Sequence, residues 1–176
     1  MLATIVLLGL LAVATTTDLL YRKIYNWTTY SGILAGFALS AAGFGCVEMR
    51  ESLLGFLICG FLMLVCFVML GIGGGDVKLL VMLGAFMGVE EGITAMLWTF
   101  VLGACMGLIM LIWRVGPVRA ASSAVRLALL KLGVGHWGPM SEEERAELKL
   151  PLFLAPAALV AVVIVRLLPP EWLLMT

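Results

Sequence analysis

The sequence predicts an all-α polytopic membrane protein, a bundle of about six transmembrane helices, from its composition and from its apolar runs. Of the 176 residues, 63% are hydrophobic and only 12% are charged, whereas about 25% of residues are charged in soluble domains. A helix needs about 20 apolar residues to cross roughly 30 Å of hydrocarbon. The candidate spans are residues 2–20, 27–47, 52–70, 77–89, 92–113 and 150–168. The fourth is short, so we expect it either to tilt little or to extend into the flanking glycines.

Lysine and arginine are distributed unevenly between the connections of these segments, and such residues favour the cytoplasmic side of a membrane. All but two of the 11 basic residues lie in the first, third and fifth connections. The exceptions are Arg50, on the opposite side, and Arg166, which lies near the end of the sixth segment and can extend toward the interface. We therefore expect the odd-numbered connections in the cytoplasm and both termini outside.

We expect this chain to bind no metal, no cofactor and no nucleic acid. The formal net charge is zero, and a nucleic-acid surface needs a strong excess of basic residues. The cysteines form no CxxC pair and lie in or beside apolar segments, at Cys46, Cys59, Cys66 and Cys105. A zinc site needs clustered ligands, and the only histidine, His136, has no obvious partner. We expect the cysteines to be small packing residues.

Residues 114–149 form the longest connection, and we expect them in the cytoplasm, as part of a single membrane-embedded domain that covers residues 1–176. Between residues 118 and 132 the apolar residues recur at helical spacing, which is typical of a helix lying in the membrane interface. Ser141 and Glu144 then form the pattern of a capping box. We expect this connection to contribute no chemistry.

Two aspartates lie at the ends of predicted spans on the same side: Asp18 ends the first span, and Asp76 opens the fourth. Each has a structural explanation alone, because Asp76 is suited to cap a helix and Asp18 can reach the interface. An aspartate at membrane depth costs roughly 2.5 kcal/mol or more, so two on one side of a bundle indicate a functional site. Two carboxylates within about 3 Å share one proton. Such a pair can activate water for attack on a peptide carbonyl.

A cluster of glycines precedes the second aspartate: Gly71, Gly73, Gly74 and Gly75. Because these residues lack side chains, the backbone there can adopt unusual dihedral angles and let a second peptide backbone approach closely. Non-helical backbone at membrane depth lines a cavity or is buried in protein. The cluster is therefore suited to a cleft that receives an extended peptide.

The stretch "GIGGGDVKLL" contains a G-x-G-D pattern made of Gly73, Gly75 and Asp76, and it resembles the signature of type IV prepilin peptidases, a family of intramembrane aspartic proteases. The segment "DLLYRKIYN", which begins at Asp18, resembles the family's first-aspartate motif, although Tyr25 stands where proline is usual. The segment "LPLFLAPAALVAV" is similar to the proline-bearing last span of short members.

This resemblance implies that Asp18 and Asp76 are catalytic and that Gly73, Gly75 and Lys78 support them. Two roles stay open for Lys78: electrostatic tuning of the aspartates and anchoring at the membrane interface. Neither role is decided by the sequence.

The resemblance also implies a substrate, a location and a limit on the activity. The substrate is expected to be a prepilin or pseudopilin whose short basic leader is removed at the cytoplasmic face of a bacterial inner membrane. The zinc-binding cytoplasmic region of larger members has no counterpart in these residues. The chain therefore looks like the short, cleavage-only branch that serves Flp or tight-adherence pili, without N-methyltransferase activity. A homodimer stays possible.

Two other functions remain open. Intramembrane carboxylates also serve as proton relays in transporters, although a transporter site normally lies near the bilayer midplane between repeats, and the sequence contains no repeat. A non-enzymatic assembly subunit would use the small-residue spacings of "GILAG", "GAFMG" and "GACMG" for helix packing. In such a subunit both aspartates would be dispensable.

Overall fold

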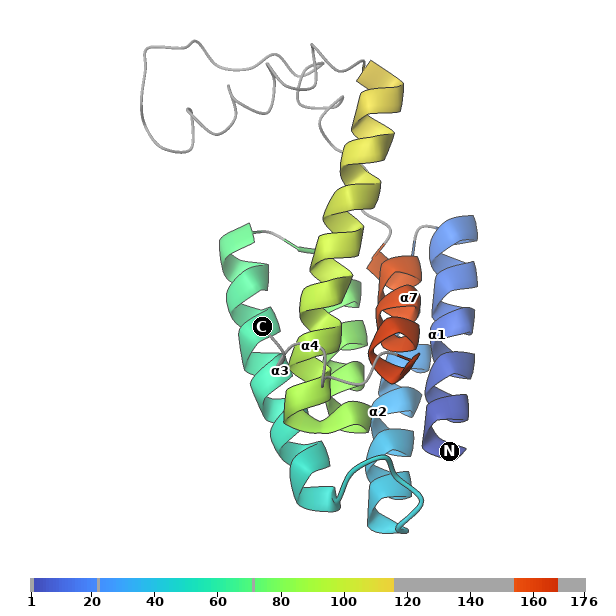
Figure 1. Cartoon of the computed structure of the whole chain (residues 1–176), viewed down its shortest axis with the longest axis vertical. Helices are drawn as coiled ribbons and strands as arrows, with labels where there is room; N and C mark the ends of the chain where they lie inside the picture. Colours follow the sequence, from blue (N-terminus) through green and yellow to red (C-terminus); the bar gives the residue numbers. More distant parts are fainter. Residues whose placement is uncertain (1, 22, 71, 116–153, 168–176) are drawn as a thin grey trace. The chain divides into compact units, whose positions relative to one another are not determined.

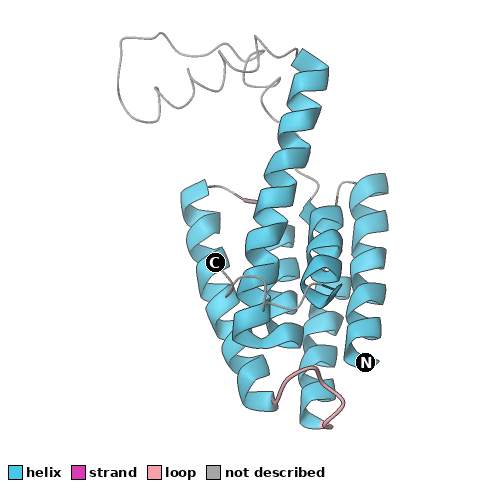
Figure 2. Cartoon of the chain, viewed as in Figure 1, coloured by secondary structure: helices cyan, strands magenta, loops and turns pink. Residues whose placement is uncertain are grey.

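A computed structural model describes residues 2–21, 23–70, 72–115 and 154–167 of the chain. Throughout these residues the regular structure is helical, without a strand (Figures 1 and 2), which confirms the all-α prediction. The helices are α1 (Leu2–Tyr21), α2 (Asn26–Ala41), α3 (Met49–Leu70), α4 (Gly74–Val115) and α7 (Leu154–Leu167). The described residues up to Leu102 form one compact unit with α7, and the end of α4 from Gly103 belongs to a second.

Within the described part of the chain, three helices are long and apolar enough to cross a membrane, over Leu2–Tyr21, Met49–Met69 and Gly74–Met110. A shorter apolar helix covers Leu154–Arg166. These helices make the chain a membrane protein, as its composition predicts. The total of six spans stays a prediction, because the last predicted segment, 150–168, extends beyond the described residues.

The chain reverses direction inside α4 at Gly88, which has φ 78° and ψ −164°. Glycine adopts this backbone conformation far more readily than any other residue. After the turn, Gly92 lies so near Gly84 that a Cβ on Gly92 would be 3.1 Å from the Cα of Gly84. In an uninterrupted helix these residues would be about 12 Å apart. α4 therefore consists of two arms, residues 74–87 and 89–115, and the second begins back along the first (Figure 1).

This reversal agrees with the separate fourth and fifth segments that the apolar pattern predicts. The first arm starts at Gly74, so the fourth segment does extend into the preceding glycines. The second predicted segment, residues 27–47, extends beyond the helix at its C-terminal end, because α2 ends at Ala41. The chain then turns at Gly43, whose φ is 76°, and Gly45 packs against the backbone of Ser40.

Backbones of α3 and of both α4 arms approach one another at glycines. A Cβ on Gly84 would lie 2.8 Å from the carbonyl carbon of Gly55 and 2.9 Å from the Cβ of Cys59. The hydroxyl of Ser52 in α3 donates a buried hydrogen bond of 2.5 Å to the carbonyl oxygen of Ala85. That carbonyl lies in the last turn before Gly88, where helical carbonyls lose their partners. Small residues therefore let these segments pack closely, and Ser52 satisfies a carbonyl that the turn frees.

The first arm of α4 is the most deeply buried part of the described structure, with every residue from Leu79 to Gly88 buried. α2 lies against it, since a Cβ on Gly36 would be 3.1 Å from the ring of Phe86. α1 packs against α2 and α7, and α2 packs against α3. The same core contains residues from α1 and α7, among them Leu7, Leu11, Ala158 and Val162.

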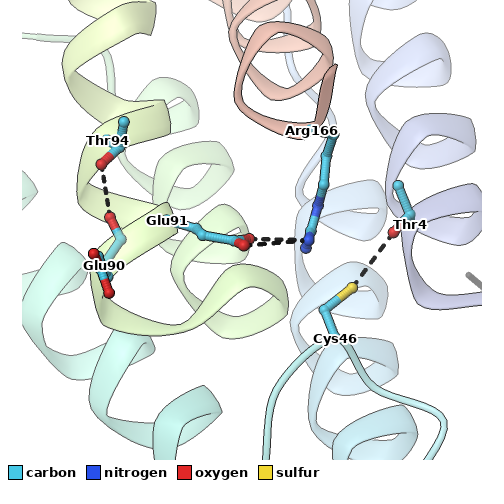
Figure 3. A network of polar contacts seen from close by, with 6 residues as sticks. All are labelled: Thr4, Cys46, Glu90, Glu91, Thr94 and Arg166. Atoms are coloured by element: carbon cyan, nitrogen blue, oxygen red, sulfur yellow. Dashed lines mark hydrogen bonds and ion pairs between the residues drawn. The ribbon is translucent and has the colours of Figure 1, made fainter. Parts of the chain in front are cut away.

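A group of polar contacts lies at the opposite end of the bundle from Asp18. Thr4, which takes part in one of them, is 14 residues from Asp18 on α1, a distance of about 20 Å along the helix. Figure 3 shows the Arg166 guanidinium at the end of α7 paired with Glu91 of α4 at 3.0 Å. The hydroxyl of Thr4 lies 3.5 Å from the Cys46 sulfur. Arg166, expected only to extend toward the interface, thus connects the last helix to the second arm of α4.

The expected helix over 118–132, the capping box at Ser141 and Glu144, and His136 all lie outside the described residues. They stay predictions.

Replacement of Gly84 by alanine is expected to destabilise the bundle, because the added Cβ meets backbone carbon and the base of a side chain, neither of which can move easily. Such overpacking costs about 1–3 kcal/mol. The measurement is thermal unfolding in detergent. Gly9→Ala in α1 is the matched control, since a Cβ there has no atom within 4 Å. Equal unfolding temperatures for both variants would contradict the close packing at Gly84.

Candidate active site

Asp18 occupies the buried face of α1. The helix buries Ala3, Leu7, Leu11, Ala14 and Asp18, which follow each other at intervals of three or four residues and therefore share one face. Asp18 is 7% exposed. The apolar pattern of α1 thus carries a carboxylate into the protein at the last turn of the helix.

The start of α7 supplies a hydrogen-bond donor to this carboxylate. The backbone N–H of Ala155, the second residue of α7, donates to Asp18. N–H groups of a first helical turn have no partner within the helix, and they favour a negative charge nearby. Asp18 Oδ2 has no hydrogen-bond partner among the residues that the structure describes. One carboxylate oxygen is therefore left for another proton or donor.

Asp76 lies in the first turn of α4 and is half-buried. Its N–H donates to the carbonyl oxygen of Gly73 at 3.0 Å, so the residues of the G-x-G-D pattern form the turn that starts the helix. A Cβ on Gly73 would lie 3.0 Å from Asp76 Oδ2. The missing side chain at Gly73 therefore leaves room for the carboxylate of Asp76.

The second glycine of the pattern makes room for the connection that follows Asp18. A Cβ on Gly75 would lie 3.2 Å from the Cβ of Ile24, and Ile24 lies between α1 and α2. The start of α4 is thus packed against the segment that leaves the end of α1. The two aspartates, 58 positions apart in the sequence, therefore lie at the same end of the packed helices.

Gly73, Gly74 and Gly75, the described glycines of the cluster, do not have a positive φ. Gly74 and Gly75 are helical, and Gly73 is not among the described glycines with positive φ, which are Gly43 and Gly88. Gly71 lies outside the described residues. Close packing explains Gly73 and Gly75 instead, because each leaves space that a neighbouring side chain fills.

Lys78 contacts the start of α2. Its ammonium donates a hydrogen bond of 2.8 Å to Asn26 Oδ1 and lies 4.9 Å from the centre of the Tyr30 ring. Both partners come from the first turns of α2. Lys78 therefore joins the helix of Asp76 to the helix that follows Asp18, a contact that neither of its two expected roles includes.

The described arrangement can perform acid–base chemistry with two carboxylates. Adjacent carboxylates avoid two negative charges by sharing a proton, and one can then accept a proton while the other donates one. Among the described residues, no group of three or more histidine, cysteine, aspartate or glutamate side chains is placed to hold a metal ion.

Sequence reasoning did not find two contributors to this site. The N–H of Ala155 is a backbone group, so no residue type marks it; the only local signal is Pro156, which suits the first turn of a helix. Asn26 stands in the first-aspartate motif, but nothing in that motif indicates a contact with a lysine 52 residues away.

Comparison with known proteins adds one match. The model of the type IV leader peptidase family matches residues 5–108, which is more than half of the chain and includes both aspartates and Lys78. This agrees with the resemblance found from the two motifs. No curated protein matches the chain significantly, and no solved structure does so either.

Ala155→Pro is expected to lower the free energy of unfolding by about 1–3 kcal/mol, because it removes the donor to a buried carboxylate at a helix position that tolerates proline. Thermal unfolding in detergent measures the loss. The same substitution in an Asp18→Leu background serves as control and should cost clearly less. Equal losses in both backgrounds would show that the N–H does not act on Asp18.

Proposed function

Because this chain belongs to the type IV leader peptidase family, we propose that it is an aspartic endopeptidase that removes the leader peptide from prepilins or pseudopilins. A peptidase follows from membership of the family. The aspartic mechanism is supported by one observation: Gly75, next to Asp76, packs against Ile24 in the connection that follows Asp18, so the two aspartates lie at the same end of the packed helices.

The surroundings of the two aspartates favour different roles. Asp18 accepts the N–H of Ala155, and a donated N–H stabilises a carboxylate. In the proposed mechanism, ionised Asp18 takes a proton from water as the water oxygen bonds to the peptide carbonyl carbon. Protonated Asp76 donates its proton to the carbonyl oxygen. The amine then leaves with the proton that Asp18 took from water, while one hydroxyl of the diol intermediate returns a proton to Asp76. The peptide bond is thus broken, one water is consumed, and both aspartates regain their starting states.

The exposed side of Asp76 offers a place for the substrate backbone. Gly73 and Gly74 are exposed, and a Cβ on Gly74 would have no atom within 4 Å. A peptide in extended form can therefore come close to the start of α4. An opened peptide is required because a helix shields the amide that is to be cut.

The remaining parts of the proposal follow from the basic residues and the family resemblance. The site faces the cytoplasm from a bacterial inner membrane, and both termini lie on the other side. The leader is short and basic, and cleavage occurs without N-methylation of the product. The protein acts without a metal or another cofactor.

Asp18→Asn and Asp76→Asn should each lower leader removal at least about 10³-fold, the scale seen when one member of a catalytic unit is lost. The assay co-expresses the chain with a tagged prepilin from the same genome and follows the size of the product. Glu90→Gln is the control, since this exposed glutamate is also on α4 but follows the Gly88 turn. Cleavage that survives in either aspartate variant would exclude the pair as the catalyst, and pilus assembly without cleavage would favour a scaffold.

Cleavage by the purified protein should follow a bell-shaped pH profile, because the reaction needs one ionised and one protonated carboxylate. At low pH both carboxyl groups are protonated and no base remains; at high pH both are ionised and no acid remains. Initial rates measured across the acidic and neutral range test this expectation. A flat profile would contradict the shared proton.

A further inference from the structure

The hydrogen bond between Lys78 and Asn26 joins the two chain segments that contain the aspartates. Asn26 is the first residue of α2, eight residues after Asp18, and Lys78 is two residues after Asp76. The Nζ–Oδ1 distance is 2.8 Å, which is a good length for a hydrogen bond with a charged donor. The ring of Tyr30 lies 4.9 Å from the same ammonium, within the range of a cation–π contact.

The position of Lys78 on the helix separates it from the aspartate pair. Residues two apart in a helix point about 200° from one another, so Lys78 and Asp76 are on nearly opposite sides of the first turn. The contacts of Lys78 run to Asn26 and Tyr30 of α2 instead, so its effect on the site is exerted through the position of α2.

Both aspartates lie beside backbone that is not helical. α1 ends three residues after Asp18, and α4 begins two residues before Asp76. Helix packing alone therefore does not fix the two ends that carry the carboxylates. Contacts among the described residues cross the gap: the apolar contact of Ile24 with Gly75, and the polar contacts of Lys78 with Asn26 and Tyr30.

We infer that Lys78 and Asn26 are positioning residues, which hold the start of α4 against the α1–α2 connection and so set the separation of the two aspartates. This inference rests on the proposed function of the pair. A shared proton needs two oxygens at hydrogen-bond distance, and a displacement of about 1 Å can cost about 10²-fold in rate.

Substitutions test the bridge through catalysis. Lys78→Met and Asn26→Leu should each lower kcat for leader removal about 10–100-fold and leave KM nearly unchanged. The double variant should be no slower than the slower single variant, because both remove the same contact. Lys78→Arg should recover much of the rate, since it keeps a charged donor. Arg50→Met, which removes an exposed basic residue from the first turn of α3, is the matched control and should leave kcat unchanged.

A second measurement does not need activity. The Cβ atoms of Ile24→Cys and Gly75→Cys would lie close to the separation found in disulfides. Oxidation of this double variant should produce an intrachain crosslink, detected by mass spectrometry of the joined peptides. Adding Lys78→Met should slow crosslinking several-fold, whereas adding Arg50→Met should not.

The two measurements separate the possible failures. Unchanged kcat and unchanged crosslinking in Lys78→Met would overturn the bridge, and so would losses that multiply in the double variant. A wild-type protein that cleaves no prepilin would overturn the proposed function instead, while the crosslinking rates would still decide whether Lys78 holds the two segments together.

Discussion

Close backbone packing at glycines is the constraint on which the rest of the structure depends. The first arm of α4 is buried from Leu79 to Met87. On its sides toward α3 and the second arm, Gly55, Gly84 and Gly92 leave no side chain between the backbones, which therefore pack closely. Asp76 lies in the first turn of this arm, so the contacts that bury the arm also determine where the second carboxylate lies relative to α1.

The site itself is made of helix ends. The last turn of α1 contributes Asp18, and the first turns of α4 and α7 contribute Asp76 and the N–H of Ala155. Helix ends combine free backbone donors with a local dipole, and they lie beside irregular backbone that side chains must hold in place. Lys78 and Asn26 are such side chains. A carboxylate pair at helix ends can therefore be strongly supported on one side and open to a peptide on the other.

Much of this arrangement can be predicted from the sequence, and the physical reason for each failure is specific. Apolar runs locate the helices, and the separate fourth and fifth segments anticipate the reversal at Gly88. Motifs select Asp18 and Asp76. The sequence suggests that the glycines of the G-x-G-D pattern serve backbone flexibility. Their packing role depends on tertiary neighbours such as Ile24, which the sequence alone does not identify. The apolar pattern does not predict the end of α2, because the chain turns at Gly43 within an apolar run. The N–H of Ala155 is not predicted either, because every residue except proline has such a donor.

The reversal at Gly88 also has a consequence for the lipid around the protein. The first arm of α4 ends at residue 87 and is only about 21 Å long, about 9 Å less than a typical hydrocarbon layer. α3 beside it has 22 residues and extends about 33 Å. Because the short arm is buried in protein from Leu79 to Met87, the longer neighbouring helices meet the lipid in its place. A chain reversal at membrane depth is tolerated where protein covers it, so the short arm causes no mismatch with the bilayer.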